Sequence, residues 1–104
     1  METLDIHRDA AKRAAGEKLD AITGVVASGN LEVMLERVLE GTKCEVHIKT
    51  SIAGFDEVWH AVIEDFIERW SPGGLRISVN DGGARPDTVS LRLAQGVSLM
   101  EAAE

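Results

Sequence analysis

Residues 55–70 carry apolar side chains at the spacing of one face of an α-helix. The apolar positions are Phe55, Val58, Trp59, Val62, Ile63, Phe66, Ile67 and Trp70. Successive members lie alternately three residues and one residue apart, so the set repeats every four residues, as on a helix that packs one face against a core. Asp56 suits a helix N-terminus, and the Ser-Pro-Gly-Gly run at 71–74 ends the helix. The pattern therefore predicts a helix over 55–70 as the main core element.

Three other segments alternate between apolar and polar residues with a period of two, which is typical of half-buried strands. They cover residues 31–36, 44–52 and 75–80. A shorter β-prone run precedes the first of them and contains Ile22, Val25 and Val26. Four strands are therefore expected.

Gly29-Asn30 lies between the short β-prone run that ends near Val26 and the alternating segment 31–36. This pair predicts a two-residue hairpin turn, because glycine tolerates the positive φ of a type II′ turn. Ser28 is then expected at the hairpin tip, facing solvent. On spacing alone Ser28 is interpreted as an ordinary turn residue, although an exposed serine beside a glycine is also easy for a modifying enzyme to reach.

The two ends of the chain have weaker patterns. Residues 1–18 are polar and Ala-rich, and they are interpreted as a marginal helix or a flexible N-terminal segment before a single domain over 19–104. At the other end, Pro86 suits the first turn of a helix. Helical spacing relates Val89, Leu93, Val97 and Met100, while Val89, Leu91 and Leu93 would also serve a short strand.

The predicted order is βββαβα, which favours an α+β fold. We expect a two-layer sandwich, in which two helices cover one face of a mostly antiparallel four-stranded sheet. An outer strand face with Lys43, His47, Lys49 and Arg76 is a candidate docking surface for partners.

Composition narrows the function classes. The chain has 104 residues with 11 basic and 18 acidic side chains, a net charge of −7. This charge argues against a nucleic-acid partner, which usually meets a basic surface. The longest uncharged run, Ala21 to Leu31, is too short to span a bilayer, and no secretory signal is evident, so a cytoplasmic protein is expected.

Candidate catalytic and metal-binding groups are few. His60 and Glu64 lie four residues apart on the polar side of the predicted helix, but no third ligand accompanies them, so they are interpreted as a solvated face. His7 and His47 are expected at the surface, and the lone Cys44 is expected in the core without a thiolate role. No G-x-S-x-G elbow, P-loop or G-x-G-x-x-G motif occurs, which disfavours an independent hydrolase.

Several stretches resemble the acyl carrier (delta) subunit of bacterial malonate decarboxylase and, more distantly, the acyl carrier subunit of citrate lyase. The resemblance rests on Ser28–Glu36, Thr50–Gly54, Leu75–Ile77, Asn80–Pro86, Leu91–Leu93 and the start Met1–Leu4. The first of these stretches is the most specific.

The resemblance implies a non-catalytic carrier without a metal. Ser28 would bear a covalent phosphoribosyl-dephospho-coenzyme A (phosphoribosyl-dephospho-CoA) through a phosphodiester, with Gly29 and Asn30 as the supporting turn. Asn30 stands where such carriers commonly have aspartate. The arm would carry acetyl and malonyl thioesters. The implied partners are acyl-transferase and decarboxylase subunits, a prosthetic-group transferase and a malonyl transferase.

Two alternatives remain open at this point. One is a carrier subunit of a citrate-lyase-like complex. The other is an unmodified α+β interaction or regulatory subunit in which Ser28 is only a turn residue.

Overall fold

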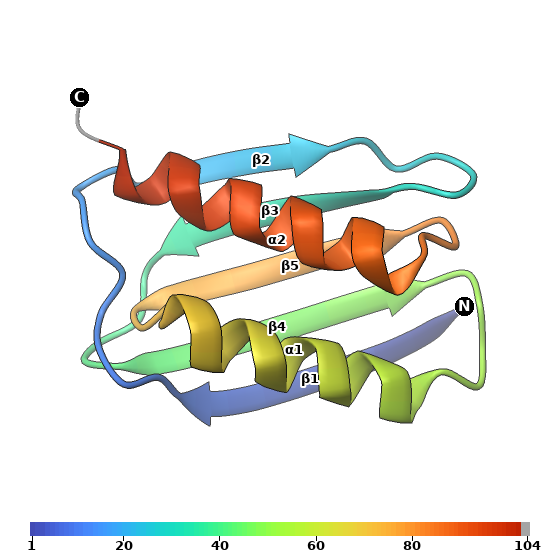
Figure 1. The fold of residues 1–104 in the computed structure, drawn as a ribbon, viewed down its shortest axis with the longest axis horizontal. Coiled ribbons are helices and arrows are strands. Elements are labelled where there is room, and N and C mark those ends of the chain that lie inside the picture. Colours follow the sequence, from blue (N-terminus) through green and yellow to red (C-terminus); the bar gives the residue numbers. More distant parts are fainter. Residues whose placement is uncertain (103–104) are drawn as a thin grey trace.

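The computed structural model describes residues 1–102, which form one five-stranded sheet and two helices (Figure 1). The elements in chain order are β1 (Glu2–Asp9), β2 (Asp20–Gly24), β3 (Leu31–Arg37), β4 (Lys43–Thr50), α1 (Asp56–Trp70), β5 (Leu75–Asp81) and α2 (Pro86–Glu101). The strands predicted from alternation at 31–36, 44–52 and 75–80 are confirmed to within two residues at their ends.

The sheet is mixed, with the strand order β1-β4-β5-β3-β2. Three neighbouring pairs are antiparallel, whereas β4 and β5 run parallel. Parallel neighbours need a crossover connection, and α1 supplies it between these two strands. The α+β class is confirmed, and three of the four strand pairs are antiparallel as expected. The expected number of four strands is wrong, because the sheet has five, and β4 and β5 form a parallel pair.

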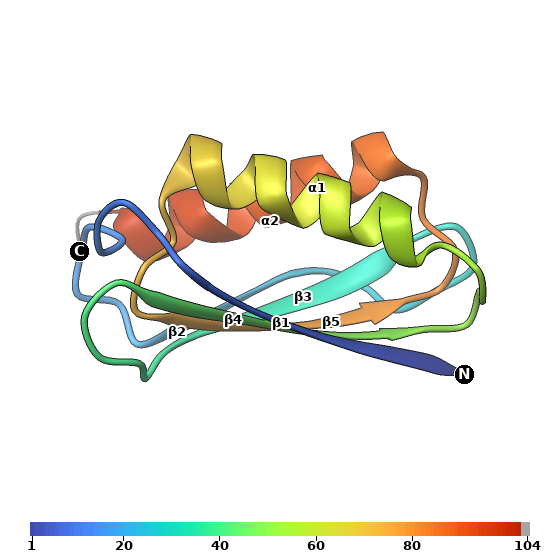
Figure 2. The same ribbon diagram turned by 90° about the horizontal axis from the view of Figure 1, so that it is seen from below.

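Both helices lie on one face of the sheet, and the other face is uncovered (Figure 2). Alternate strand residues point toward the helices and are fully buried, which accounts for the period of two in the sequence. The most buried side chains of this core include Leu31, Val33, Leu35, Val46, Ile48, Leu75, Ile77, Ile63 and Leu93.

Strand β1 is the element that the sequence pattern missed. The expected marginal helix near the N-terminus is wrong, because residues 2–9 pair antiparallel with β4 along the full strand. Leu4 and Ile6 point into the core, and Ile6 lies opposite Val46. Only two inward apolar residues mark the strand, so its conformation depends on the backbone hydrogen bonds that β4 provides.

Helix α1 matches its predicted apolar stripe. Trp59, Ile63, Phe66 and Ile67 are buried against the sheet. The helix ends at Ser71, whose left-handed backbone (φ 44°) and N–H bond to the Ile67 carbonyl close the last turn. The expected side-chain cap by Asp56 is wrong, since Asp56 is the first helical residue and the preceding cap position makes no side-chain hydrogen bond.

The ambiguous C-terminal segment is helical. Val89, Leu93, Val97 and Met100 are buried, whereas Leu91 is exposed, as a helical period requires and a strand period does not. Pro86 occupies the start of the helix as expected. Neither helix of the described residues is long and apolar enough to cross a membrane.

Candidate attachment site at Ser28

Ser28 lies in the loop that joins β2 to β3. The register pairs Gly24 with Glu32, so residues 25–30 form the connection and the predicted two-residue turn at Gly29-Asn30 is wrong. The Asn30 N–H instead donates to the Ala27 carbonyl at 3.0 Å, which makes residues 27–30 a β-turn. Gly29 has a φ of 74°, as a type II turn requires at its third residue. Ser28 therefore occupies the second position of a tight turn, and its side chain is exposed.

The turn is anchored to the connection between β5 and α2. The Gly29 N–H donates to the Gly82 carbonyl at 2.9 Å, and the Gly82 N–H donates to the Asn30 carbonyl at 2.8 Å. The Asn30 side chain also accepts a hydrogen bond from the Leu31 N–H at 2.8 Å. These bonds satisfy the backbone that follows Ser28, and the Ala27 carbonyl before it accepts from the Asn30 N–H, so the serine is exposed on a tethered loop rather than on a free one.

Gly82 leaves no room for a side chain beneath this loop. A Cβ atom built on Gly82 would lie 2.1 Å from the Ala27 carbonyl oxygen and 3.2 Å from that of Asn30. By contrast, a Cβ on Gly29 would meet nothing within 4 Å. The loop is therefore packed tightly on its inner side and open beside Ser28.

Arg92 on α2 lies at the base of the same loop. Its Cδ and Nε atoms are 3.2 and 3.3 Å from the Cβ position of Gly24, the last residue of β2. One terminal nitrogen donates to Gln95 at 3.0 Å, while the buried Nε has no hydrogen-bond partner among residues 1–102. Sequence reasoning noted Arg92 only as part of a resembling stretch, because nothing local shows that α2 passes beside this loop.

The other candidate groups lie away from Ser28. Glu64 accepts a hydrogen bond from Arg8 Nε at 2.5 Å, and His60 is exposed on α1. Residues 1–102 contain no group of three or more side chains that could hold a metal ion.

Cys44 is buried in the core, as the alternation of β4 predicts. Burial raises the pKa of its thiol to about 12, and the neighbouring Glu45 carboxylate adds to that increase. A thiol with such a pKa stays protonated at neutral pH and is a poor nucleophile.

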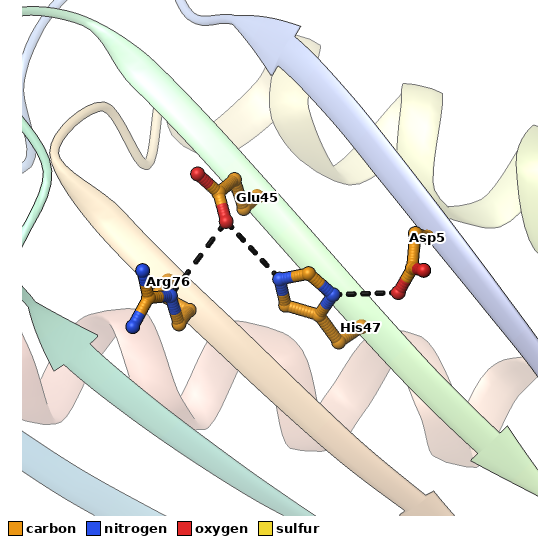
Figure 3. Close-up of polar contacts among 4 residues, drawn as sticks. All are labelled: Asp5, Glu45, His47 and Arg76. Carbon is orange, nitrogen blue, oxygen red and sulfur yellow. Dashed lines mark hydrogen bonds and ion pairs between the residues drawn. The ribbon is translucent and has the colours of Figure 1, made fainter.

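The uncovered sheet face carries a row of charged contacts (Figure 3). His47 Nδ1 lies 2.6 Å from Asp5 Oδ1, and its Nε2 lies 3.1 Å from Glu45 Oε1. Arg76 Nε lies 3.6 Å from the same Glu45 oxygen. The hydrogen bond to Asp5, followed by the one to Glu45, raises the pKa of His47, while the hydrogen bond from His47 lowers the pKa of Glu45.

The residues proposed for docking lie on β4 and β5: Lys43, His47, Lys49 and Arg76. Figure 3 shows His47 and Arg76 on the uncovered face of the sheet. The carboxylates of Asp5 and Glu45 are interleaved with them. Asp5 could not be foreseen there, since β1 was not expected to be a strand. The face is a mixed-charge surface rather than a basic patch.

Comparison with known proteins identifies the family. The family model of the malonate decarboxylase delta subunit (MdcD) matches residues 18–100. A malonate decarboxylase acyl carrier protein of Bradyrhizobium diazoefficiens is 62% identical over 97 residues, which cover 93% of this chain and 92% of that protein. One of Xanthomonas campestris pv. campestris is 47% identical over 104 residues, which cover 100% and 99% of the two chains.

A solved structure has the same fold. It is a chain in the crystal structure of a Pseudomonas malonate decarboxylase hetero-tetramer in complex with malonate, with a TM-score of 0.84 and 35% sequence identity. The superposition covers 96% of this chain and 99% of that chain. Both the sequence and the fold thus agree over nearly the whole length, and the chain belongs to the malonate decarboxylase acyl carrier (delta) subunit family.

Proposed function

We propose that this chain is the acyl carrier subunit of a malonate decarboxylase complex and that Ser28 is its attachment site. The single observation that carries the assignment of the residue is the exposed Ser28 side chain on a turn that is hydrogen-bonded to Gly82. The group on Ser28 is a phosphoribosyl-dephospho-CoA joined through a phosphodiester. Its terminal thiol supplies the thioester chemistry for acetyl and malonyl groups.

The residues around Ser28 fit such a group. The serine hydroxyl is accessible, and the open side of Gly29 leaves space for a bulky substituent. Arg92 lies at the base of the loop, and its side chain is only partly buried. A phosphate is a natural partner for a guanidinium group, so Arg92 is the residue that would hold one of the phosphates of the arm through its terminal nitrogens.

The protein's own part in this function is to present the arm on Ser28 and to be recognised by the partner proteins. A group tethered to Ser28 reaches successive active sites at an effective concentration of about millimolar, without being released. The proposed partners are the acyl-transferase and decarboxylase subunits, a prosthetic-group transferase and a malonyl transferase. The mixed-charge face with Lys43, His47, Lys49 and Arg76 is the proposed docking surface, because it is uncovered by helices.

Intact-mass measurement after co-expression with the prosthetic-group transferase tests the proposal. The wild-type chain and the control Ser51→Ala, which alters another exposed serine, should gain the mass of the arm. Ser28→Ala should gain nothing. An unchanged wild-type mass beside a transferase that loads another carrier, or a mass gain in Ser28→Ala, would contradict the assignment.

A further inference from the structure

An apolar pocket of about 320 Å³ opens between the N-terminal turns of α1 and α2. Its walls come from the β4–α1 loop, from the first turns of α1 and from the start of α2. Lining side chains include Ile52, Phe55, Val58, Trp59, Pro86 and Val89. The volume lies at the lower end of the range of small-molecule sites.

The mouth of this pocket exposes an unusual amount of apolar surface. Ile52, Phe55 and Val58 are 42%, 48% and 41% exposed. Phe55 and Val58 belong to the apolar stripe of the α1 region, but this end of the stripe extends past the buried part of the helix. Contiguous apolar surface of this kind is costly in water and usually marks a binding site.

The buried polar groups of the pocket are already satisfied by one another, and the one charged residue at its rim, the exposed Arg85, lies with its Nε 3.5 Å from Asp87 Oδ1. Thr50 Oγ1 donates to Asp81 Oδ2 at 2.9 Å, and Asp81 Oδ1 accepts from the Ala84 N–H at 2.9 Å. A ligand in this pocket therefore meets apolar walls and gains little from polar contacts. This suits methylene and thioester groups better than a charged head group.

The pocket adjoins the loop that carries Ser28. Gly83 lines the pocket, and its neighbour Gly82 exchanges hydrogen bonds with Gly29 and Asn30, the third and fourth residues of the turn. Figure 1 shows the β2–β3 loop and the β5–α2 loop side by side at the end of the molecule where both helices begin. A flexible group attached to Ser28 thus begins on a turn that is hydrogen-bonded to Gly82, the residue next to the pocket wall.

From this arrangement we infer that the pocket receives the pantetheine and thioester end of the arm on Ser28 between visits to partner subunits. The inference rests on the proposed function. The tether is what favours this occupant, because a group attached to Ser28 is always at high local concentration, whereas a partner side chain must first dock. Ile52, Phe55 and Val58 cover the thioester end and exclude water from it.

The test compares loaded and unloaded protein, and intact mass first shows whether loading has occurred. On loading, the methyl NMR signals of Ile52, Val58 and Val89 should shift, while those of the exposed Val38 and Leu99, which do not line this pocket, should not. This measurement needs only the wild-type chain, so its result does not depend on whether a variant folds.

A second readout is the rate at which iodoacetamide alkylates the thiol of the arm, with the unloaded chain as the background for Cys44. Val58→Glu should accelerate alkylation roughly fourfold for each methylene group that leaves the pocket. Val38→Glu is the matched control and should match the wild-type rate. Circular dichroism confirms that both variants are folded.

The outcomes separate the two proposals. Confirmed loading with unmoved pocket methyl signals and equal alkylation rates in both variants would overturn this inference and leave the function of Ser28 standing. An unloaded Ser28 beside an active transferase would overturn both. Shifted pocket signals with faster alkylation in Val58→Glu alone would establish the inference.

Discussion

The Gly82 N–H donates a hydrogen bond of 2.8 Å to the Asn30 carbonyl, which joins the turn that presents Ser28 to the turn that begins α2. The Gly82 carbonyl in turn accepts a hydrogen bond from the Gly29 N–H. Two loops far apart in the sequence are thus locked together by backbone alone. The position of Ser28 relative to the helices depends on this contact.

Gly82→Ala should therefore disturb the serine loop. The new Cβ would lie 2.1 Å from the Ala27 carbonyl oxygen, which is backbone and cannot move without displacing the turn. We expect a destabilisation of about 1–3 kcal/mol, or a fall in Tm of roughly 5–20 °C by thermal unfolding. Gly29→Asn is the control, since asparagine tolerates positive φ and the space there is open, and its Tm should stay near that of the wild type. Equal Tm values for Gly82→Ala and wild type would show that the loops are not in close contact.

Arg92→Gln should slow the loading of Ser28 by roughly tenfold, because a phosphate of the incoming group loses a charged donor. The measurement is the initial rate of mass gain with a limiting amount of transferase. Arg92→Lys keeps the charge and should recover part of the rate. Arg69→Gln changes an exposed arginine at the far end of α1 and should load at the wild-type rate. If all four proteins load equally fast, Arg92 has no part in holding the arm.

Ile6→Ala should destabilise the fold by about 2–4 kcal/mol in urea unfolding, although it lies in the segment with the weakest sequence pattern. Ile6 is 1% exposed and faces the core from β1, which forms one edge of the sheet. Thr3→Ala on the outer side of the same strand should change the stability by no more than about 0.5 kcal/mol. Similar midpoints for the two variants would mean that β1 does not contribute to the core.

The contacts of His47 should make the stability of the sheet depend on pH. Asp5 and Glu45 raise the pKa of His47 above its usual 6.5. The His7 and His47 rings are nearly perpendicular with their centroids 5.9 Å apart, and Arg76 contacts the same Glu45 carboxylate. The stabilisation is therefore complete below about pH 6.5 and is lost as the pH rises through the raised pKa. Because His47 is partly exposed, the contribution is below about 1 kcal/mol.

His47→Gln should accordingly lower the Tm at about pH 5.5 and have little effect at about pH 9. His60→Gln alters an exposed histidine on α1 and should show no such difference between the two pH values. At still lower pH the wild-type advantage should shrink again, because the stabilisation from Glu45 is lost as the pH falls through the lowered pKa of that carboxyl. A Tm difference for His47→Gln that grows with rising pH would contradict this assignment.

The sequence by itself determined the elements whose pattern is local. Helix α1 follows from a stripe that repeats along one helical face, and β3, β4 and β5 follow from alternation that needs no partner to be seen. The resemblance of Ser28–Glu36 to malonate decarboxylase carriers also needed no structure, and the family comparison confirms it.

Only the tertiary structure decided which elements meet. Strand β1 has two inward apolar residues and becomes a strand because β4 offers its free edge. The parallel pairing of β4 and β5 depends on the path of α1 across the sheet. Likewise, Gly82 and Arg92 are brought to the Ser28 loop by strand pairing and helix packing over long sequence distances. Periodicity reports how each segment faces water and core, but it carries no information about which distant segment supplies the other side of a contact.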